Sequence, residues 1–180
     1  MIRLNIGCGT RVIEGWVNID MVARAPGVRT DINPLDLPYR DGEVEEILAE
    51  HVFEHFGFAD EERLWRECAR VLRLGGCLEI EVPDFEWVCR MFVSAEDRFR
   101  EFYQVGADDH YFGSGRDVTQ RWGILQTMFF GNQNGAGQFH KSGYTRGKIE
   151  RIAEMVGFRQ THLRTVFNKG GQAIRARLVR

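Results

Sequence analysis

Two glycines and an aspartate stand at the ends of the first two apolar segments of the chain. Gly7 and Gly9 close the segment 4–10, and because they carry no side chain they let a ligand approach the backbone closely. Asp20 closes the segment 16–20, and a carboxylate at the tip of a second strand can accept hydrogen bonds from both hydroxyls of a ribose. These residues favour a nucleoside-containing ligand, although Asp20 alone could equally be an ordinary turn residue.

Two patterns that would indicate other cofactors are missing. The dinucleotide-binding fingerprint G-x-G-x-x-G would need glycine at position 12, where Val12 stands, so the helix start that receives a pyrophosphate is not encoded. A nicotinamide cofactor is therefore not expected. The cysteines form no CxxC pair that would suggest zinc binding or redox work, and no metal site is predicted.

The charges of the chain are nearly balanced. The 24 Lys and Arg against 26 Asp and Glu leave a net charge of -2 over 180 residues. A protein that coats nucleic acid or anionic lipid carries a one-signed excess, so neither nucleic acid nor a membrane is supported as a partner. No apolar run approaches the roughly 18 residues of a membrane-spanning helix, and no leader-like segment precedes the first strand. We therefore expect a soluble, cytoplasmic protein.

Short apolar segments alternate with helix-like segments, which predicts an α/β fold with a mostly parallel sheet. The expected strands are residues 2–6, 16–20, 44–49, 77–82, 159–166 and 172–179, with a short one near 28–31. One helix is predicted to begin at Asp60 as its N-cap and to end at the glycine pair 75–76. A second is predicted over 146–156. The last two strands, joined around 168–171, predict an antiparallel hairpin.

The first connection is short. Only about ten residues separate the first two strands, whereas a parallel crossover normally needs about a dozen or more. The first helix should therefore be reduced to a turn or two, leaving one face of the sheet thinly covered. Strands 2–6 and 77–82 also alternate polar with apolar residues, so Arg3, Glu79 and Glu81 are expected to meet water or a partner on that face.

Aromatic residues are concentrated in one third of the chain. Residues 85–144 hold 13 of the 21 aromatic side chains. We interpret this stretch as a helical, aromatic-rich cap inserted into a single domain that spans residues 1–180, beside the carboxyl edge of the sheet. The rings are expected to form a satellite core, with a specific aromatic substrate pocket as the alternative.

Five motifs occur in a fixed order along the first half of the chain. They are LNIGCGT at 4–10, GWVNID at 15–20, LPYRDG at 37–42, EHVFEH at 50–55, and RVLRLGG at 70–76 followed by VPD at 82–84. In this order they resemble the class I S-adenosylmethionine (SAM)-dependent methyltransferases, in particular small members in which GWxNxD follows LNxGCG almost at once. Residues 140–158 resemble the last helix of the family and the strand after it, and residues 85–139 are not matched closely.

The resemblance implies a Rossmann-like sheet, mostly parallel with the last strand antiparallel, and SAM as cofactor with S-adenosylhomocysteine (SAH) as product. Gly7, Cys8 and Gly9 would face the methionine part of SAM. Asp20 would take the ribose hydroxyls. This agrees with the rule that ligands of open α/β sheets bind outside the carboxyl ends of the strands.

The resemblance also implies how the far ends of SAM are bound. Asp31 with Ile32, after the third strand, would meet the adenine edge, and Asp36 is a competing assignment because the spacing to the LPY segment is longer than usual. Glu50 and His51, at the end of the fourth strand, would lie beside the sulfonium.

Methyl transfer from a sulfonium is an in-line displacement that depends mainly on positioning, and a general base helps when the acceptor is a hydroxyl. The candidate bases are His51, Glu54, His55, Asp84 and His140. We predict His51 and His140 as the catalytic residues, because imidazole titrates near neutral pH, although each could instead only bond a backbone carbonyl. Glu54 and His55 are interpreted as loop packing and capping residues.

The acceptor expected from the family is a small molecule or a carbohydrate-linked group, methylated on oxygen or nitrogen. The main alternative function is a SAM-fold binding module that has lost methyl transfer, and another is a reaction that uses SAM differently. Because no helix precedes the first strand, we expect the SAM site to be left open, or to be covered by the cap or by a second subunit in a homo-oligomer.

Overall fold

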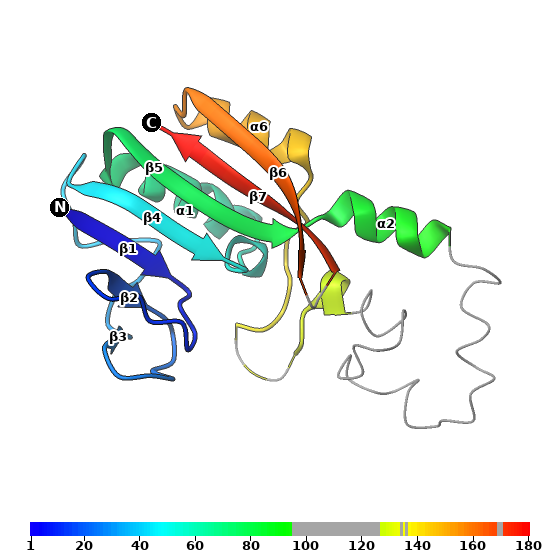
Figure 1. The fold of residues 1–180 in the computed structure, drawn as a ribbon, viewed down its shortest axis with the longest axis horizontal. Coiled ribbons are helices and arrows are strands. Elements are labelled where there is room, and N and C mark those ends of the chain that lie inside the picture. The colour runs from blue at the N-terminus through cyan, green and yellow to red at the C-terminus, as the bar shows by residue number, and fades with distance from the viewer. Residues whose placement is uncertain (95–126, 134, 136, 169–170) are drawn as a thin grey trace.

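The computed structural model describes residues 1–94, 127–133, 135, 137–168 and 171–180. They form a seven-stranded sheet in the order β3-β2-β1-β4-β5-β7-β6 (Figure 1). The strands are β1 (Ile2–Ile6), β2 (Val17–Ile19), β3 (Val28–Arg29), β4 (Val44–Glu50), β5 (Leu72–Pro83), β6 (Gln160–Asn168) and β7 (Gly171–Val179). β7 runs antiparallel to β5 and to β6, and the remaining pairs are parallel. The predicted Rossmann-like sheet with an antiparallel last strand is confirmed.

Helices connect these strands: the 3-10 turn η1 (Phe53–His55) and the α-helices α1 (Phe58–Val71), α2 (Phe85–Val93) and α6 (Arg146–Met155). α6 matches the helix predicted over 146–156. α1 begins after Gly57, which has no side chain to cap it, so the prediction of Asp60 as N-cap is wrong and Asp60 lies in the first turn. Leu64 and Trp65 of α1 are fully buried in the core against the sheet. None of the helices in the described ranges is long and apolar enough to cross a membrane.

β5 begins at Leu72, directly after α1, although the prediction placed the strand start at 77 and ended the helix at the glycine pair 75–76. The register between β4 and β5 shifts between Val44 and Glu46, so the extra residues of β5 bulge out of the ladder. A Cβ on Gly76 would lie 2.8 Å from a backbone carbonyl oxygen, which no side chain could tolerate without a shift. The glycine pair thus serves a bulged strand rather than a helix end.

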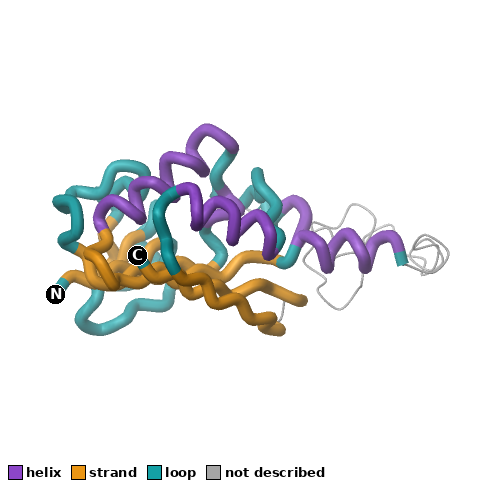
Figure 2. Tube along the Cα trace, turned by 90° about the horizontal axis from the view of Figure 1, so that it is seen from above, coloured by secondary structure: helices purple, strands orange, loops and turns teal. Residues whose placement is uncertain are grey.

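α1 and α6 lie on the same face of the sheet (Figure 2). The connection from β1 to β2 consists of turns and loop only. The short first helix that was predicted there is therefore not formed. The opposite face carries paired charges along β5 and β7, where Glu79 lies opposite Arg177 and Glu81 opposite Arg175. Of the two environments expected for Glu81, water or a partner, water is wrong: the residue is only 6% exposed, because Arg175 and His51 of the same chain both contact its carboxylate.

The cap predicted over 85–144 is described only at its two ends, because residues 95–126 lie outside the described residues. α2 follows β5 directly, and residues 127–130 are helical. Phe85 and Phe92 of α2 both pack edge-on against Phe129, with ring centroids 5.6 and 6.1 Å apart. At these two ends the aromatic side chains contact one another but stay partly exposed, Phe85 by 36% and Phe92 by 44%, so the satellite core stays a prediction.

Candidate active site

The carboxyl ends of the parallel strands border one cleft of about 1160 Å³. Its lining comes from the loops after β1, β2, β3 and β4, from the ends of β5 and β7, and from described residues between 127 and 141. The strand order reverses between β1 and β4, and ligands of open α/β sheets bind at this point. Ligand pockets usually measure about 300–1,000 Å³, so this cleft has room for a nucleoside cofactor and a small second molecule.

The glycine loop after β1 lines this cleft through Gly7 and Gly9, both with positive φ, at 66° and 54°. A Cβ on Gly7 would lie 2.3 Å from Cγ2 of Val52, whereas a Cβ on Gly9 would meet no atom within 4 Å. Gly7 is thus required by the packing of Val52, while the space above Gly9 is open to a ligand. The Cys8 thiol between them is buried and does not line the cleft, so Cys8 can offer a ligand only its backbone.

Asp20, after β2, borders the cleft and binds the glycine loop at the same time. Its Oδ2 accepts a hydrogen bond from the Gly9 N–H at 2.8 Å, and its Oδ1 accepts one from the Val22 N–H at 3.0 Å. A carboxylate has about four lone-pair sites, so each oxygen can still accept a hydroxyl donor from the cleft. The side chain predicted to bind ribose also holds the loop predicted to bind the rest of the ligand.

After β3, Asp31 and Ile32 line the cleft, and Ile32 is buried. Arg29 donates two hydrogen bonds to Asp31, at 2.7 and 2.6 Å, and these bonds lower the pKa of Asp31 to about 2. Asp36, the competing residue, borders a separate groove beside α1. The geometry therefore favours Asp31 over Asp36 as the residue that faces a ligand in the cleft.

At the end of β4, Glu50 and His51 also line the cleft. Glu50 forms ion pairs with Arg11 and, at 2.9 Å, with Arg175. His51 has a φ of 54°, in the left-handed region that costs a non-glycine residue about 1–3 kcal/mol. Its N–H donates to the Glu81 carbonyl oxygen at 2.8 Å, which helps to hold this strained conformation in place.

The imidazole of His51 lies between two carboxylates. Nδ1 is 3.2 Å from Glu54 Oε1, and Nε2 is 3.2 Å from Glu81 Oε1. Burial acts to lower the pKa of His51, but the hydrogen bonds to Glu54 and Glu81 outweigh it and raise the pKa to about 10. His51 is therefore protonated at neutral pH, and a protonated imidazole does not suit the predicted role of a general base.

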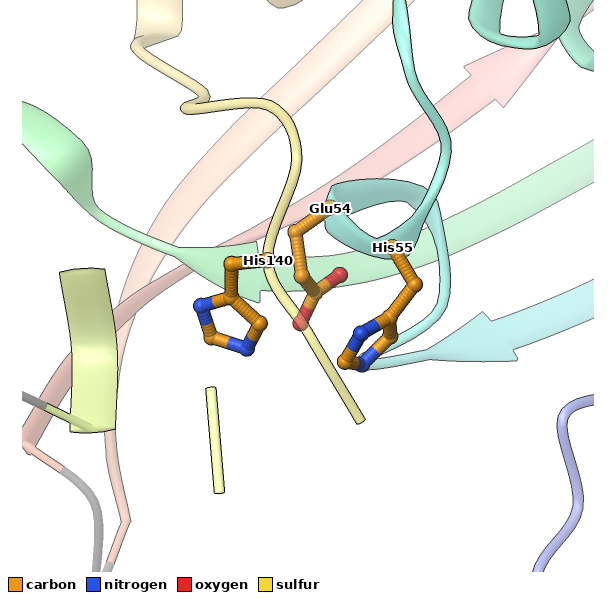
Figure 3. A group of neighbouring side chains, drawn as sticks. All are labelled: Glu54, His55 and His140. Carbon is orange, nitrogen blue, oxygen red and sulfur yellow. The ribbon is translucent and has the colours of Figure 1, made fainter. Parts of the chain in front are cut away.

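Glu54, His55 and His140 form a cluster (Figure 3). Glu54 joins this cluster to His51 through the contact described above. The imidazole rings of His55 and His140 meet edge to face with centroids 4.9 Å apart. His140 Nδ1 lies 2.8 Å from the Met128 carbonyl oxygen, and burial lowers the pKa of His140, so this ring is neutral at neutral pH. His55 and His140 line the cleft, while Glu54 is buried next to them.

The sequence named Glu54 and His55 among the candidate bases but favoured loop packing and capping for both, and the structure brings them together with His140. η1 is a single tight turn placed just after the end of β4, so it returns both side chains toward the strand tip instead of carrying them away. The available signal was the spacing H-x-x-E-H from His51 to His55. Asp84, another candidate base, has a structural role: it accepts from the Trp87 N–H to cap α2 and from Gln172 Nε2.

Comparison with known proteins agrees with this geometry. The family model described as Methyltransferase domain matches residues 17–80. A SAM-dependent methyltransferase from Archaeoglobus fulgidus has a similar fold, with a TM-score of 0.60 and 12% identity over 99% of this chain and 85% of that one. A SAM-dependent methyltransferase from Thermotoga maritima gives a TM-score of 0.57 and 15% identity over 99% and 81%.

A third solved structure contains ligands. It is the 1,6-didemethyltoxoflavin-N1-methyltransferase of Burkholderia thailandensis with bound 1,6-didemethyltoxoflavin and SAH, with a TM-score of 0.58 and 10% identity over 99% of this chain and 70% of that one. A search of curated protein sequences finds no match. At these identities the solved structures establish the shared fold, and the family model covers the strands and loops from β2 to β5. Residues 17–80 of this chain match the methyltransferase domain, and the described residues share the fold of SAM-dependent methyltransferases.

Proposed function

We propose that this chain transfers a methyl group from SAM to a small acceptor that binds in the same cleft, on the side of His51 and His140. The observation that carries the proposal is the continuity of the cleft: one cavity is bordered by the glycine loop and Asp20 at one part and by His51 and His140 at another. Donor and acceptor could therefore lie next to each other, and such proximity supplies most of what an in-line displacement needs from a protein.

The residues at the glycine loop fit SAM. The open space over Gly9 would admit the methionine part, with Cys8 contributing only its backbone, and the free lone pairs of Asp20 would accept the ribose hydroxyls. Asp31 and Ile32 would contact the adenine, Asp31 through its polar carboxylate and Ile32 through its apolar side chain. When bound, SAM supplies a methyl group already activated by the sulfonium.

Glu50 and His51 would lie beside the sulfonium, but neither is assigned as a general base. Glu50, Glu54 and Glu81 form ion pairs with Arg11, Arg175 and protonated His51, and Arg175 also pairs with Glu79 at 3.6 Å. In this network both ring nitrogens of His51 donate to carboxylates. We therefore assign His51 as a positioning residue that orients Glu54.

His140 is the histidine that can serve the acceptor. Its Nδ1–H donates to the Met128 carbonyl oxygen, so its Nε2 keeps a lone pair on a ring that lines the cleft. An acceptor hydroxyl or protonated amine has to lose a proton during methyl transfer. Nε2 of His140 can assist this loss by accepting the proton itself, or by binding a metal ion that lowers the pKa of the acceptor. Small molecules, including carbohydrate-linked hydroxyls and amines, are the acceptor class that we propose.

Turnover with methyl-labelled SAM tests this proposal. The purified chain would be incubated with labelled SAM and panels of saccharides, phenols and amines, and the labelled product and SAH would be measured by mass spectrometry. We expect SAH to form only when an acceptor is present. At low SAM concentration Asp20→Ala should lower this signal in proportion to its weaker SAM binding, while Asp36→Ala, outside the cleft, should not lower it. SAM binding without turnover on any panel would instead support a binding module.

A further inference from the structure

We propose that Glu54, His55 and His140 bind a divalent transition-metal ion on the acceptor side of the cleft. Each residue offers one ligand atom, and these three atoms lie within 4.8 Å of one another (Figure 3). Two of the residues come from the turn after β4 and the third from the segment that returns to the sheet before α6. The three side chains thus converge although they are far apart in the sequence.

Both histidines already have the hydrogen bonds that a metal-binding histidine requires. His140 Nδ1 lies 2.8 Å from the Met128 carbonyl oxygen, and His55 Nδ1 lies 3.0 Å from the Phe139 carbonyl oxygen. Each Nδ1 therefore carries the proton and donates it, which leaves the lone pair on Nε2. Metal-ligating histidines almost always donate their other ring N–H to a carbonyl or carboxylate, because this fixes the tautomer and the ring orientation.

Glu54 provides a second, independent observation. The residue is 1% exposed, and among the described residues its Oε2 has no hydrogen-bond partner. An unsatisfied buried polar group costs about 1–3 kcal/mol, and a charged one costs more, so a structure retains one only when something else satisfies it. His51 Nδ1 binds the other oxygen, Oε1, and thereby holds the carboxylate in place. A cation between Oε2 and the imidazoles would remove this cost.

The donor set selects the class of ion. Two imidazoles and one carboxylate suit zinc and other borderline transition metals, whereas magnesium and calcium prefer oxygen ligands only. Two histidines and one glutamate are a ligand set of catalytic zinc sites, which keep a position open for water or substrate. Because His55 and His140 line the cleft, the open position would face the bound acceptor. Zinc is our first choice, since the reaction needs no redox change.

The role of the ion rests on the proposed function. An acceptor hydroxyl that enters the open position would lose its proton to solvent more readily, because a bound metal lowers the pKa of an oxygen ligand. The oxygen then forms a bond to the methyl carbon as the carbon–sulfur bond of SAM breaks, and SAH leaves with the bonding electron pair. In this arrangement His140 acts through the metal rather than as the base itself.

Metal binding is measured without SAM, so that the result does not depend on methyl transfer. The chain is stripped with a chelator, dialysed, and titrated with Zn²⁺ by calorimetry. We expect one ion per chain. Even loss of a residue that only supports a metal ligand costs about 10–100-fold in affinity, so His140→Ala, His55→Ala and Glu54→Gln should each weaken zinc by at least that factor. His162→Ala and Glu150→Gln, at exposed positions, are the matched controls and should bind zinc like the parent.

Thermal melting in chelator shows whether each variant is folded. Glu54 is buried, so if Glu54→Gln melts early, the two histidine variants decide the result. The proposal is overturned if the parent binds no zinc, or if folded His55→Ala and His140→Ala bind it as tightly as His162→Ala does. Zinc binding without any turnover would support the metal site and count only against the proposed function. Turnover by a chain that binds no zinc would support the proposed function and overturn the metal site.

Discussion

The Gly9 N–H donates to the Asp20 carboxylate over 2.8 Å, which joins the loop after β1 to the loop after β2. The two parts of the proposed SAM site are therefore one unit. A ligand that binds the carboxylate also meets a glycine loop that the same carboxylate holds in position.

Replacement of Asp20 should affect SAM more than the fold. A hydrogen bond to a charged group contributes about 1.5–3 kcal/mol, so Asp20→Ala should weaken SAM binding by about tenfold to a few hundredfold. Calorimetry with SAM and SAH measures the loss, and Asp36→Ala, which removes an exposed carboxylate outside the cleft, is the matched control. If Asp20→Ala melts like the parent and binds SAM as tightly, Asp20 is only a turn residue.

The two glycines of the loop should differ in what they tolerate. Both have positive φ, so alanine costs about 1–2 kcal/mol at either position. At Gly7 the new methyl group would also collide with Val52, whereas at Gly9 it meets open space. Overpacking typically costs about 1–3 kcal/mol, so Gly7→Ala should be less stable than Gly9→Ala by about that amount in chemical denaturation.

The collision itself can be tested by removing the other partner. In a Val52→Ala background, the additional cost of Gly7→Ala should largely disappear, because Cγ2 of Val52 is the atom in the way. The cost of Gly9→Ala should be the same in both backgrounds. Equal effects of Gly7→Ala with and without the Val52 side chain would show that backbone strain alone explains the glycine.

Much of this architecture could be predicted from local pattern. The positions of the strands follow from short apolar segments, and the ordered motifs indicated the edge of the sheet where the cleft lies. The errors occur where distant residues decide the local structure. The helix end at Val71 depends on the pairing of Leu72 with Val44 on β4, and Glu81 is buried because Arg175 lies opposite it on β7.

The site could be predicted only in part, for the same reason. Gly9 and Asp20 follow the ends of their strands, and this alone predicts that they border the cleft, whatever residues surround them. The protonation of His51 depends on Glu54 and Glu81, and the latter comes from a different strand. Likewise His140 joins His55 through a return of the chain that no local spacing records. Charge states and side-chain clusters are properties of the tertiary structure.

Glu67 gives a pH dependence that can be checked away from the cleft. Hydrogen bonds from Arg70 and from the Leu37 N–H hold the pKa of Glu67 below its ordinary value of 4.5. Because the pKa is lower in the folded chain than in the unfolded one, ionised Glu67 stabilises the fold above about pH 4.5. This contribution is lost as the pH falls further, through the folded-state pKa.

Melting curves at two pH values test this expectation. The melting temperature of Glu67→Gln should lie clearly below that of the parent at pH 7, and the gap should narrow at pH 3. Glu62→Gln, which breaks an exposed pair with Arg66 on the same helix, should change little at either pH. A gap for Glu67→Gln that does not depend on pH would show that its hydrogen bonds, and not its charge, matter.

Removal of metal should separate donor binding from methyl transfer. The residues assigned to the methionine, ribose and adenine of SAM lie at the glycine loop and at the ends of β2 and β3, and Glu50 and His51 at the end of β4 are assigned to its sulfonium. The proposed ion is held by other residues, in the turn after β4 and the segment before α6. Chelation should therefore leave SAM affinity unchanged and lower turnover on a hydroxyl acceptor, since a deprotonated hydroxyl is the group that the ion would stabilise. Added Zn²⁺ should restore the turnover of the parent and of His162→Ala, but it should restore the turnover of His140→Ala only weakly. Equal turnover of the parent with and without chelator, at a pH where the acceptor hydroxyl is protonated in solution, would leave Nε2 of His140 as the group that takes the proton directly.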